Sequence, residues 1–350
     1  MAESPVHGTV EPRFEPVREV FVRSLAEVEL GAAVCAYVDG KKVIDLWGGW
    51  ADAAGTREWQ QDTIACTFSA TKAMTATCAH VLVDRGLLDV DEPVSAYWPE
   101  FAQAGKVDIT MRMVLSHQAG LPRTTARISK DKWLDWKTVS AALARQAPIW
   151  EPGTRVEYHG GTFGYLVGNV IERIDGRALS TFFQEEIAEP LGADYLIAFG
   201  PEHDHRCAEM VGPDDMVGPS NTRLWRAAGD GAATGFGSAE GLARVYAALA
   251  FGGSLEGVRL LDDETIDAAV EEQPLARADG PAGDFGLGYQ LFWKVFPGMN
   301  AWTFGHTGMG GSLGLADRKR SLAMACVMNQ MGDGMAAAEL VNTTYAVLVA

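Results

Sequence analysis

Two residues in the first third of the chain have the types and the spacing of an activated nucleophile. Ser69 and Lys72 stand three residues apart, at the head of a segment, 73–83, that contains no Asp, Glu, Lys or Arg. Side chains at i and i+3 share one face of a helix. A helix that is apolar nearly all round is buried, and burial lowers the pKa of a lysine that has no carboxylate partner. Such a lysine can activate a serine hydroxyl for covalent catalysis.

The same spacing also permits a structural interpretation, in which Ser69 caps the helix and the amine of Lys72 reaches solvent. A second pair with this spacing, Ser129 and Lys132, lies in the charged stretch RISKDKW. No apolar helix follows that stretch, so we interpret it as a solvated loop or helix start. Because short motifs occur by chance, the choice for Ser69 and Lys72 depends on the rest of the chain.

A serine–lysine site also needs a proton shuttle and backbone donors for the oxyanion. Two glycine-rich stretches could supply them. WEPGTRVEYHGGTFGYLVG, at 150–168, presents Tyr158 after a Pro-Gly turn, and WTFGHTGMGGSLG, at 302–314, is a strand that runs into a glycine-rich edge. Glycines at such an edge let a substrate approach the backbone closely.

The elements that would position these residues are strands at both ends of the chain and helices between them. Residues 31–52 are typical of two strands around an Asp-Gly turn, a strong hairpin signal. Further strands are indicated at 301–306, 311–317 and 321–330, with flanking helices at 15–28 and 335–349. We therefore expect an α/β (α+β) fold, in which an antiparallel sheet is flanked by helices. The predicted domains are a discontinuous α/β domain, 1–74 and 228–350, and a mainly helical insertion domain, 75–227.

The composition of the chain limits the classes of partner that the protein is expected to bind. The chain has 350 residues and a formal net charge of −17, which argues against nucleic acid and anionic membrane surfaces as partners. The first 20 residues lack the pattern of a secretory signal, and no apolar run approaches 18 residues. The five cysteines show no CxxC spacing, which indicates reduced thiols. These features predict a cytoplasmic location and a small-molecule substrate, and they leave the oligomeric state open.

The three stretches together resemble the serine β-lactamase and penicillin-binding-protein superfamily, most closely its class C-like branch and the family VIII carboxylesterases. The motifs occur in that family's order: Ser69-Ala-Thr-Lys72, Tyr158-His-Gly160 and His306-Thr-Gly308. The resemblance implies the β-lactamase-like fold and a serine hydrolase that forms an acyl-enzyme and needs no cofactor or metal.

In this family's scheme, the resemblance implies that Ser69 is the nucleophile and that Lys72 and Tyr158 act as a coupled proton-transfer pair. Which of these two is the base stays open, since strongly coupled groups titrate as a unit. The resemblance further implies an oxyanion hole formed by the backbone N–H groups of Ser69 and Met309. The expected substrate-binding residues are His159, His306, Thr307 and Gly308.

Two departures from the β-lactamase pattern favour esters over β-lactams. Gly160 stands where such β-lactamases carry an asparagine, and His306 stands where they carry a lysine. We therefore expect a carboxylesterase that prefers short-chain esters. The alternatives are a β-lactamase or D-amino-acid peptidase, an acyltransferase on the same fold, or a scaffold without catalytic activity.

Other residues have patterns that could suggest chemistry. Ser312 lies in a G-x-S-x-G match, but an α/β-hydrolase needs a histidine after its serine, and none of the seven histidines follows Ser312. The stretch PEHDHRC, at 201–207, could ligate a metal, but we interpret it as a polar surface loop. We expect His80 to be a hydrogen-bonded core residue and His117 to hold its loop. Four tryptophans, Trp133, Trp136, Trp150 and Trp225, could line an acyl pocket or serve only in packing.

Overall fold

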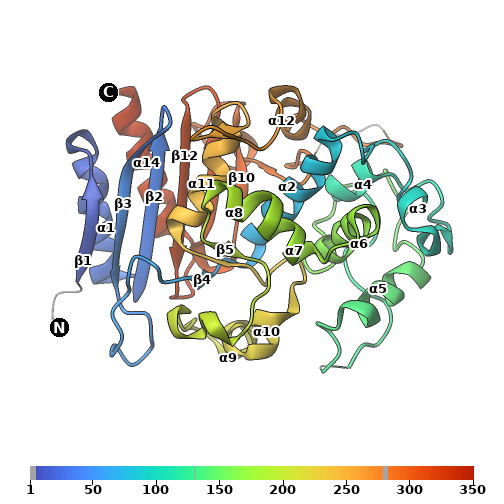
Figure 1. The fold of residues 1–350 in the computed structure, drawn as a ribbon, viewed down its shortest axis with the longest axis horizontal. Helices are drawn as coiled ribbons and strands as arrows, with labels where there is room; N and C mark the ends of the chain where they lie inside the picture. Colours follow the sequence, from blue (N-terminus) through green and yellow to red (C-terminus); the bar gives the residue numbers. More distant parts are fainter. Residues whose placement is uncertain (1–4, 130, 279–282) are drawn as a thin grey trace.

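The computed structural model describes residues 5–129, 131–278 and 283–350, and its centre is a seven-stranded antiparallel sheet (Figure 1). The strands follow the order β1-β3-β2-β12-β11-β10-β9, so the two ends of the chain meet in the middle of the sheet. Their bounds are Val6–Val10 (β1), Gly31–Val38 (β2), Lys41–Gly49 (β3), Gln290–Leu291 (β9), Thr303–Thr307 (β10), Leu313–Asp317 (β11) and Leu322–Met328 (β12). The predicted antiparallel sheet is confirmed.

Alternate residues of the central strands supply two separate hydrophobic layers. In β2, Cys35 and Tyr37 belong to the layer beneath α11 (Ala239–Ala250), whereas Val34 belongs to the layer beneath α1 (Glu15–Glu27) and α14 (Met335–Val349). Successive side chains of a strand point to opposite faces, so a strand buried on both faces is apolar throughout. This is why GAAVCAYV carries no polar alternation.

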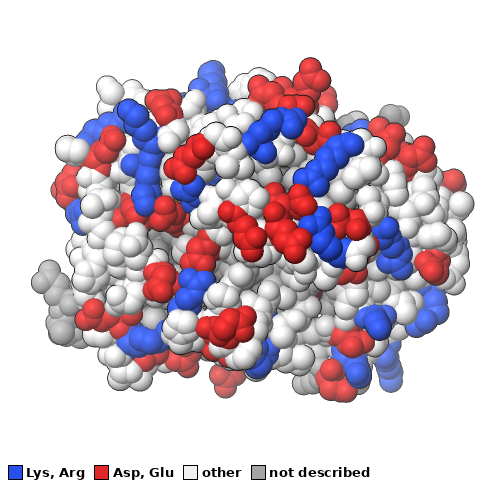
Figure 2. Space-filling model, in the orientation of Figure 1, with Lys and Arg blue, Asp and Glu red and all other residues white. Residues whose placement is uncertain are grey.

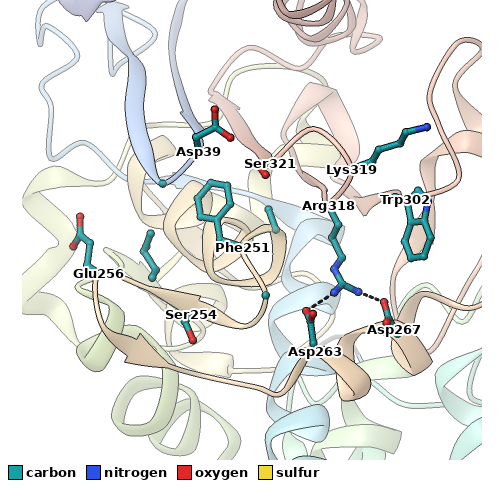
Figure 3. Close-up of a pocket in the computed structure, with 14 residues that line it drawn as sticks. Asp39, Phe251, Ser254, Glu256, Asp263, Asp267, Trp302, Arg318, Lys319 and Ser321 are labelled. Carbon is teal, nitrogen blue, oxygen red and sulfur yellow. Dashed lines mark hydrogen bonds and ion pairs between the residues drawn. The ribbon is translucent and has the colours of Figure 1, made fainter.

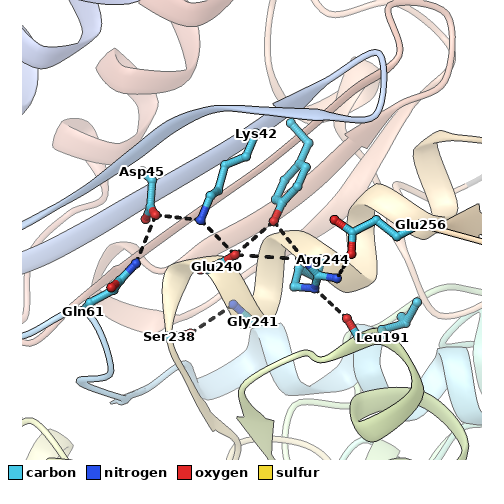
Figure 4. Close-up of polar contacts among 10 residues, drawn as sticks. Lys42, Asp45, Gln61, Leu191, Ser238, Glu240, Gly241, Arg244 and Glu256 are labelled. Atoms are coloured by element: carbon cyan, nitrogen blue, oxygen red, sulfur yellow. Dashed lines mark hydrogen bonds and ion pairs between the residues drawn. The ribbon is translucent and has the colours of Figure 1, made fainter. Parts of the chain in front are cut away.

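A polar network fastens α11 to the edge of the β2–β3 hairpin (Figure 4). Lys42 Nζ donates to Asp45 at 2.8 Å and to Glu240 at 2.9 Å. Tyr37 donates to Glu240 at 3.2 Å, and Arg244 pairs with Glu256. Because every charge in this network has a partner of opposite sign, we interpret it as structural.

Most of the remaining helices gather on the α11 side of the sheet, to the right in Figure 1. The α-helices are α2 (Thr71–Asp84), α3 (Val94–Tyr97), α4 (Met111–Leu115), α5 (Trp136–Arg145), α6 (Phe163–Asp175), α7 (Leu179–Phe183), α8 (Glu189–Leu191), α9 (Asp214–Val217), α10 (Arg223–Ala228), α12 (Asp263–Val270) and α13 (Phe292–Val295). The 3₁₀ turns are η1 (Pro12–Phe14), η2 (Phe68–Ala70), η3 (Pro99–Ala102), η5 (Pro201–Arg206), η6 (Gly218–Asn221) and η7 (Met309–Gly311), and η4 (Gln184–Ala188) is a π-helical turn.

Short strands complete the fold. β4 (Ala65–Cys66), β6 (Phe236–Gly237) and β5 (Tyr195–Leu196) form a three-stranded sheet, and β7 (Ser254–Leu255) pairs with β8 (Val258–Arg259). The edge strand β1 was not predicted, because VHGTV has a glycine at its centre. Gly8 has a φ of +98°, and a Cβ there would lie 2.0 Å from the Asp45 carbonyl oxygen. The division into two domains stays a prediction.

Candidate active site

Ser69 lies in the short 3₁₀ turn η2, which runs directly into α2. The residue before it, Phe68, has a φ of +44°, in the left-handed region that non-glycine residues rarely adopt. The turn is held by Thr67, whose N–H donates to Gly235 O at 2.9 Å and whose hydroxyl lies 2.6 Å from that of Tyr195. Unusual backbone of this kind persists only where its surroundings fix it. The half-buried Ser69 hydroxyl is therefore held at the head of a buried helix.

Lys72 is completely buried one turn further along α2. Its Nζ lies 3.1 Å from Ser69 Oγ and donates to the Ala232 carbonyl at 2.8 Å. Burial lowers the pKa of Lys72 to about 7, and the negative charge of Asp230 opposes that effect. A large fraction of the molecules then carry a neutral amine near pH 7, and a neutral amine can accept the proton of Ser69.

The turn that carries Ala232 was missed by sequence reasoning. Asp230 Oδ1 accepts the N–H groups of Ala232 and Ala233 at 2.8 Å each and that of Thr234 at 3.1 Å. The carbonyl of Gly231 accepts the hydroxyl of Thr75, one turn after Lys72. The stretch GDGAATG contains the signal, an Asp followed by small residues, but this pattern is common in ordinary turns.

Tyr158 is held in front of Lys72 by a loop that closes on His117. The His117 carbonyl accepts the N–H of Glu157 at 3.1 Å, and its Nδ1 accepts the N–H of His159 at 3.2 Å. The Lys72 Nζ lies 4.9 Å from the centre of the Tyr158 ring. As predicted, His117 fixes its own loop, 115–122, by hydrogen bonds, and the partners in these bonds belong to the loop that presents Tyr158.

The acidity of Tyr158 separates its role from that of Lys72. Loss of solvation raises the pKa of its hydroxyl to about 12, although a hydrogen bond with Ser69 acts in the opposite direction. The phenol is therefore protonated near neutral pH, where it can donate a proton.

The structure corrects the expectation that His159 binds substrate. Its side chain is fully buried, and both ring nitrogens are occupied. Nδ1 donates to the Glu157 carbonyl at 2.7 Å, and Nε2 accepts the N–H of Leu121 at 3.0 Å. His159 therefore joins two loops beneath Tyr158, and the sequence suggested contact with substrate only because the two residues are adjacent.

His306 and Thr307 close the opposite side of the site at the end of β10. His306 Nδ1 donates to the Thr307 carbonyl at 2.7 Å, so a neutral ring leaves its Nε2 as a bare acceptor. Burial, reinforced by the charge of Lys72, lowers the pKa of His306 to about 3. Thr307 donates both its N–H and its hydroxyl to Gln290 Oε1, at 2.8 and 3.0 Å. Gln290 is a further residue that sequence reasoning missed.

Gly308 and Ser312 bring the β10 edge against the turn that carries Ser69. A Cβ on Gly308 would lie 2.1 Å from the Thr67 carbonyl oxygen, so only glycine fits there. The buried Ser312 donates to the same carbonyl at 3.0 Å. Ser312 is thus engaged in joining the two segments, directly before β11 begins.

The backbone around Met309 can provide oxyanion donors. Within the described residues, the N–H groups of Ser69 and Met309 donate to no backbone carbonyl. Met309 itself begins η7, and the residue is 40% exposed. A carbonyl oxygen that enters between η2 and η7 could meet both donors.

Aromatic rings continue outward from the Ser69 turn on one side. Trp225 packs edge-on against Phe68, with centroids 6.3 Å apart, and Trp133 lies 5.8 Å beyond it. Trp136 and Trp150 contact Tyr165 and His159 instead. Of the four tryptophans, Trp225 and Trp133 therefore form the chain of rings that begins next to Ser69.

The other sequence candidates lie outside this arrangement. His80 donates to the Leu287 carbonyl at 2.7 Å from inside α2, as expected of a core histidine. In the PEHDHRC stretch, the Asp204 carboxylate is paired with Arg223 and Arg226, and no three metal-binding side chains converge among the described residues. Ser129 is exposed.

A large cavity of about 860 Å³ lies away from Ser69 (Figure 3). It is lined by the β2–β3 and β11–β12 turns, which are at the opposite end of the sheet from Thr307. Arg318 projects into it and is paired with Asp263 and Asp267. This cavity offers no lysine–serine pair at hydrogen-bond distance among its described residues, so its size does not make it the reactive site.

Comparisons with known proteins agree with this geometry. Residues 17–346 match the family described as Beta-lactamase. The chain is 34% identical over 365 residues to "Esterase/beta-lactamase LipL" of Mycobacterium tuberculosis (strain ATCC 25618 / H37Rv), a match that covers 93% of this chain and 83% of LipL.

Solved structures agree as well. A family VIII carboxylesterase superposes with a TM-score of 0.91 at 37% identity, covering 98% of this chain and all of the other. A penicillin-binding protein homologue from Caulobacter crescentus gives 0.90 at 35% identity, with coverage of 98% and 100%.

The fold and these comparisons define a serine hydrolase with the β-lactamase fold. The chain belongs to the β-lactamase family, within the superfamily of serine β-lactamases and penicillin-binding proteins. None of the helices in the described ranges has the length and apolar character needed to cross a bilayer. On the face shown in Figure 2, acidic and basic side chains are interspersed.

Proposed function

We propose that the protein is a carboxylesterase that hydrolyses short-chain esters through an acyl-enzyme on Ser69. The observation that carries the proposal is the 3.1 Å contact between Ser69 Oγ and a buried lysine whose pKa is lowered to about 7. A neutral amine at this position is a competent base at neutral pH, and a buried charged one would not be.

The proposed reaction uses Lys72 as the base and Tyr158 as a proton donor. Lys72 takes the Ser69 proton as Oγ attacks the ester carbon, and the carbonyl electron pair moves to an oxygen held by the N–H groups of Ser69 and Met309. Collapse of this intermediate breaks the bond to the leaving alkoxide, which is protonated through Tyr158, and Lys72 returns a proton to Tyr158. Water then attacks the acyl-enzyme by the same proton path and restores Ser69.

The preference for esters rests on His306 and Gly160. A neutral His306, with a bare Nε2, supplies no positive charge for the carboxylate of a β-lactam. Thr307 adds to this effect, because its hydroxyl proton already points to Gln290. Gly160 offers no side chain to an amide. A simple ester has neither a carboxylate nor a side-chain amide, so it loses nothing at these positions.

The test compares kcat/KM for p-nitrophenyl acetate or butyrate with that for nitrocefin on one preparation. Two missing polar interactions, at about 1–3 kcal/mol each, predict that the ester value exceeds the nitrocefin value by about 100-fold or more. Ser69→Ala should abolish ester hydrolysis, and Ser129→Ala, which changes the exposed S-x-x-K pair, should leave it unchanged. A nitrocefin value at or above the ester value would favour a β-lactamase.

A further inference from the structure

Asp230 is a buried carboxylate that no step of the proposed reaction uses. The residue is 5% exposed, and Oδ1 accepts three successive backbone N–H groups and the hydroxyl of Thr234. These four hydrogen bonds fix the position of the carboxylate. Asp230 is therefore an acidic side chain held in one position inside the protein.

This carboxylate lies on the turn that contacts Lys72. The Ala232 N–H donates to Asp230 Oδ1, and the carbonyl of the same residue accepts from Lys72 Nζ at 2.8 Å. The turn is confined on both sides. A Cβ on Gly231 would lie 2.5 Å from Leu179, and a Cβ on Gly164 of α6 would lie 1.9 Å from the Asp230 carbonyl oxygen. The carboxylate, the carbonyl and the amine thus form one rigid series.

The other ionisable groups around Lys72 carry little charge at neutral pH. Burial lowers the pKa of His306 to about 3 and that of His117 well below its usual range. The pKa of Tyr158 is raised to about 12. All three are neutral near pH 7, so Asp230 is the charge that opposes the effect of burial on Lys72.

We propose that Asp230 is a positioning residue for the reaction: it holds the Ala232 carbonyl against Lys72 and sets how readily Lys72 carries a proton. This inference rests on the proposed role of Lys72 as the base for Ser69. Without the carboxylate, Lys72 would be neutral over a wider pH range and its carbonyl partner would be less firmly fixed. The charge of Asp230 thus favours the protonated form of Lys72, and its hydrogen bonds fix the carbonyl that positions the amine.

The experiment measures the rate at which a fluorophosphonate labels the enzyme as a function of pH, with the labelled residue located by peptide mass. Asp230→Asn keeps an oxygen that can accept the backbone N–H groups but removes the charge. Asp84→Asn is the matched control. It removes a carboxylate from the C-terminal end of α2, about 18 Å along the helix axis from Lys72. Asp230→Ser is a second neutral acceptor, to be used if Asp230→Asn does not fold.

The expected result is that the acidic limb of the labelling rate moves to lower pH by about one unit in Asp230→Asn and stays in place in Asp84→Asn. A role confined to holding the turn would lower the rate without moving that limb. Labelling of Ser69 with an unchanged limb, or with a limb at higher pH, would overturn the role of Asp230 alone. Labelling of another residue would overturn the proposed function and this inference with it.

Discussion

Two lysines in the described part of the chain, Lys72 and Lys106, are completely buried, and their surroundings differ. Lys106, in the helical region, donates to three carbonyls, those of Gln103 and Ala144 at 2.9 Å and that of Gln146 at 2.5 Å. An ammonium has three protons, so this cage gives each of them an acceptor, although loss of solvation still lowers the pKa of Lys106 to about 8. Lys72 has one carbonyl and the hydroxyl of Ser69. The comparison indicates that a buried lysine stabilises the fold where backbone carbonyls accept all its protons. It can take part in catalysis where one of its contacts is a nucleophile.

Replacing Lys72 should produce the largest effect. Lys72→Met is expected to lower kcat/KM for a p-nitrophenyl ester by about three or more powers of ten, since the base is lost. The same change should raise the melting temperature. Between pH 7 and 10.5, Lys72 is neutral in the folded protein and protonated in the unfolded protein, so folding must release a proton and Lys72 opposes it. Because the unfolded state binds more protons in this window, the free energy of unfolding increases as the pH rises, and the unfavourable contribution of Lys72 becomes smaller.

In thermal melts across this window, Lys72→Met should also reduce the increase of stability with pH. A melting temperature that falls at every pH would show that Lys72 stabilises the fold, as Lys106 is expected to do, and would remove the contrast between the two lysines.

Replacing Lys106 should have the reverse consequence. Lys106→Met leaves three carbonyls without their donor, and a buried unsatisfied group costs about 1–3 kcal/mol. We expect the free energy of unfolding to fall by about 3 kcal/mol in denaturant titrations, with kcat/KM per folded molecule within about twofold of wild type. A loss of kcat/KM comparable to that of Lys72→Met in folded protein would contradict the comparison.

The pH dependence of the wild-type enzyme should reflect Lys72. Its pKa of about 7 predicts that kcat/KM rises about tenfold per pH unit below pH 7 and levels off above it, because the base must be neutral. Tyr158, with a pKa of about 12, should produce no decline below pH 10. A rise centred near pH 10 would indicate that Lys72 is protonated as an ordinary lysine is.

The smallest expected effect concerns Gly160, which lies beside Tyr158 at the Lys72 site. A Cβ on Gly160 would lie 3.5 Å from the Tyr158 ring, an ordinary contact. Gly160→Asn should therefore fold and raise nitrocefin turnover by about tenfold, the value of one added hydrogen bond. Gly161→Asn, where a Cβ would meet nothing within 4 Å, is the control and should leave that turnover unchanged.

Sequence reasoning predicted the parts of the fold and site that local patterns encode. The hairpin at Asp39-Gly40, the terminal helices and the buried helix after Ser69 follow from periodicity and turn chemistry, and the structure confirms them. Contacts between residues that are far apart in the sequence could not be predicted in this way. Asp230 and Gln290 act through backbone groups of Ala232 and Thr307, and ordinary turns and short strands contain the same residue types.

The error on His159 has a related cause. In sequence it neighbours Tyr158, and only the packing of its loop on His117 and Leu121 shows that its ring faces inward. The acidity of Lys72 was predicted in direction, because an uncharged helix implies burial. Asp230, which opposes that shift, could be recognised only from the structure.

The most direct test of the account is an NMR titration of the lysines labelled with ¹³C at Cε, with the signals of Lys72 and Lys106 assigned from Lys72→Met and Lys106→Met. The account predicts that the Lys72 signal titrates with a midpoint near pH 7 and the Lys106 signal with a higher midpoint, near pH 8. A Lys72 signal that stays in its protonated position up to pH 9 or above would contradict the claim that a neutral lysine activates Ser69.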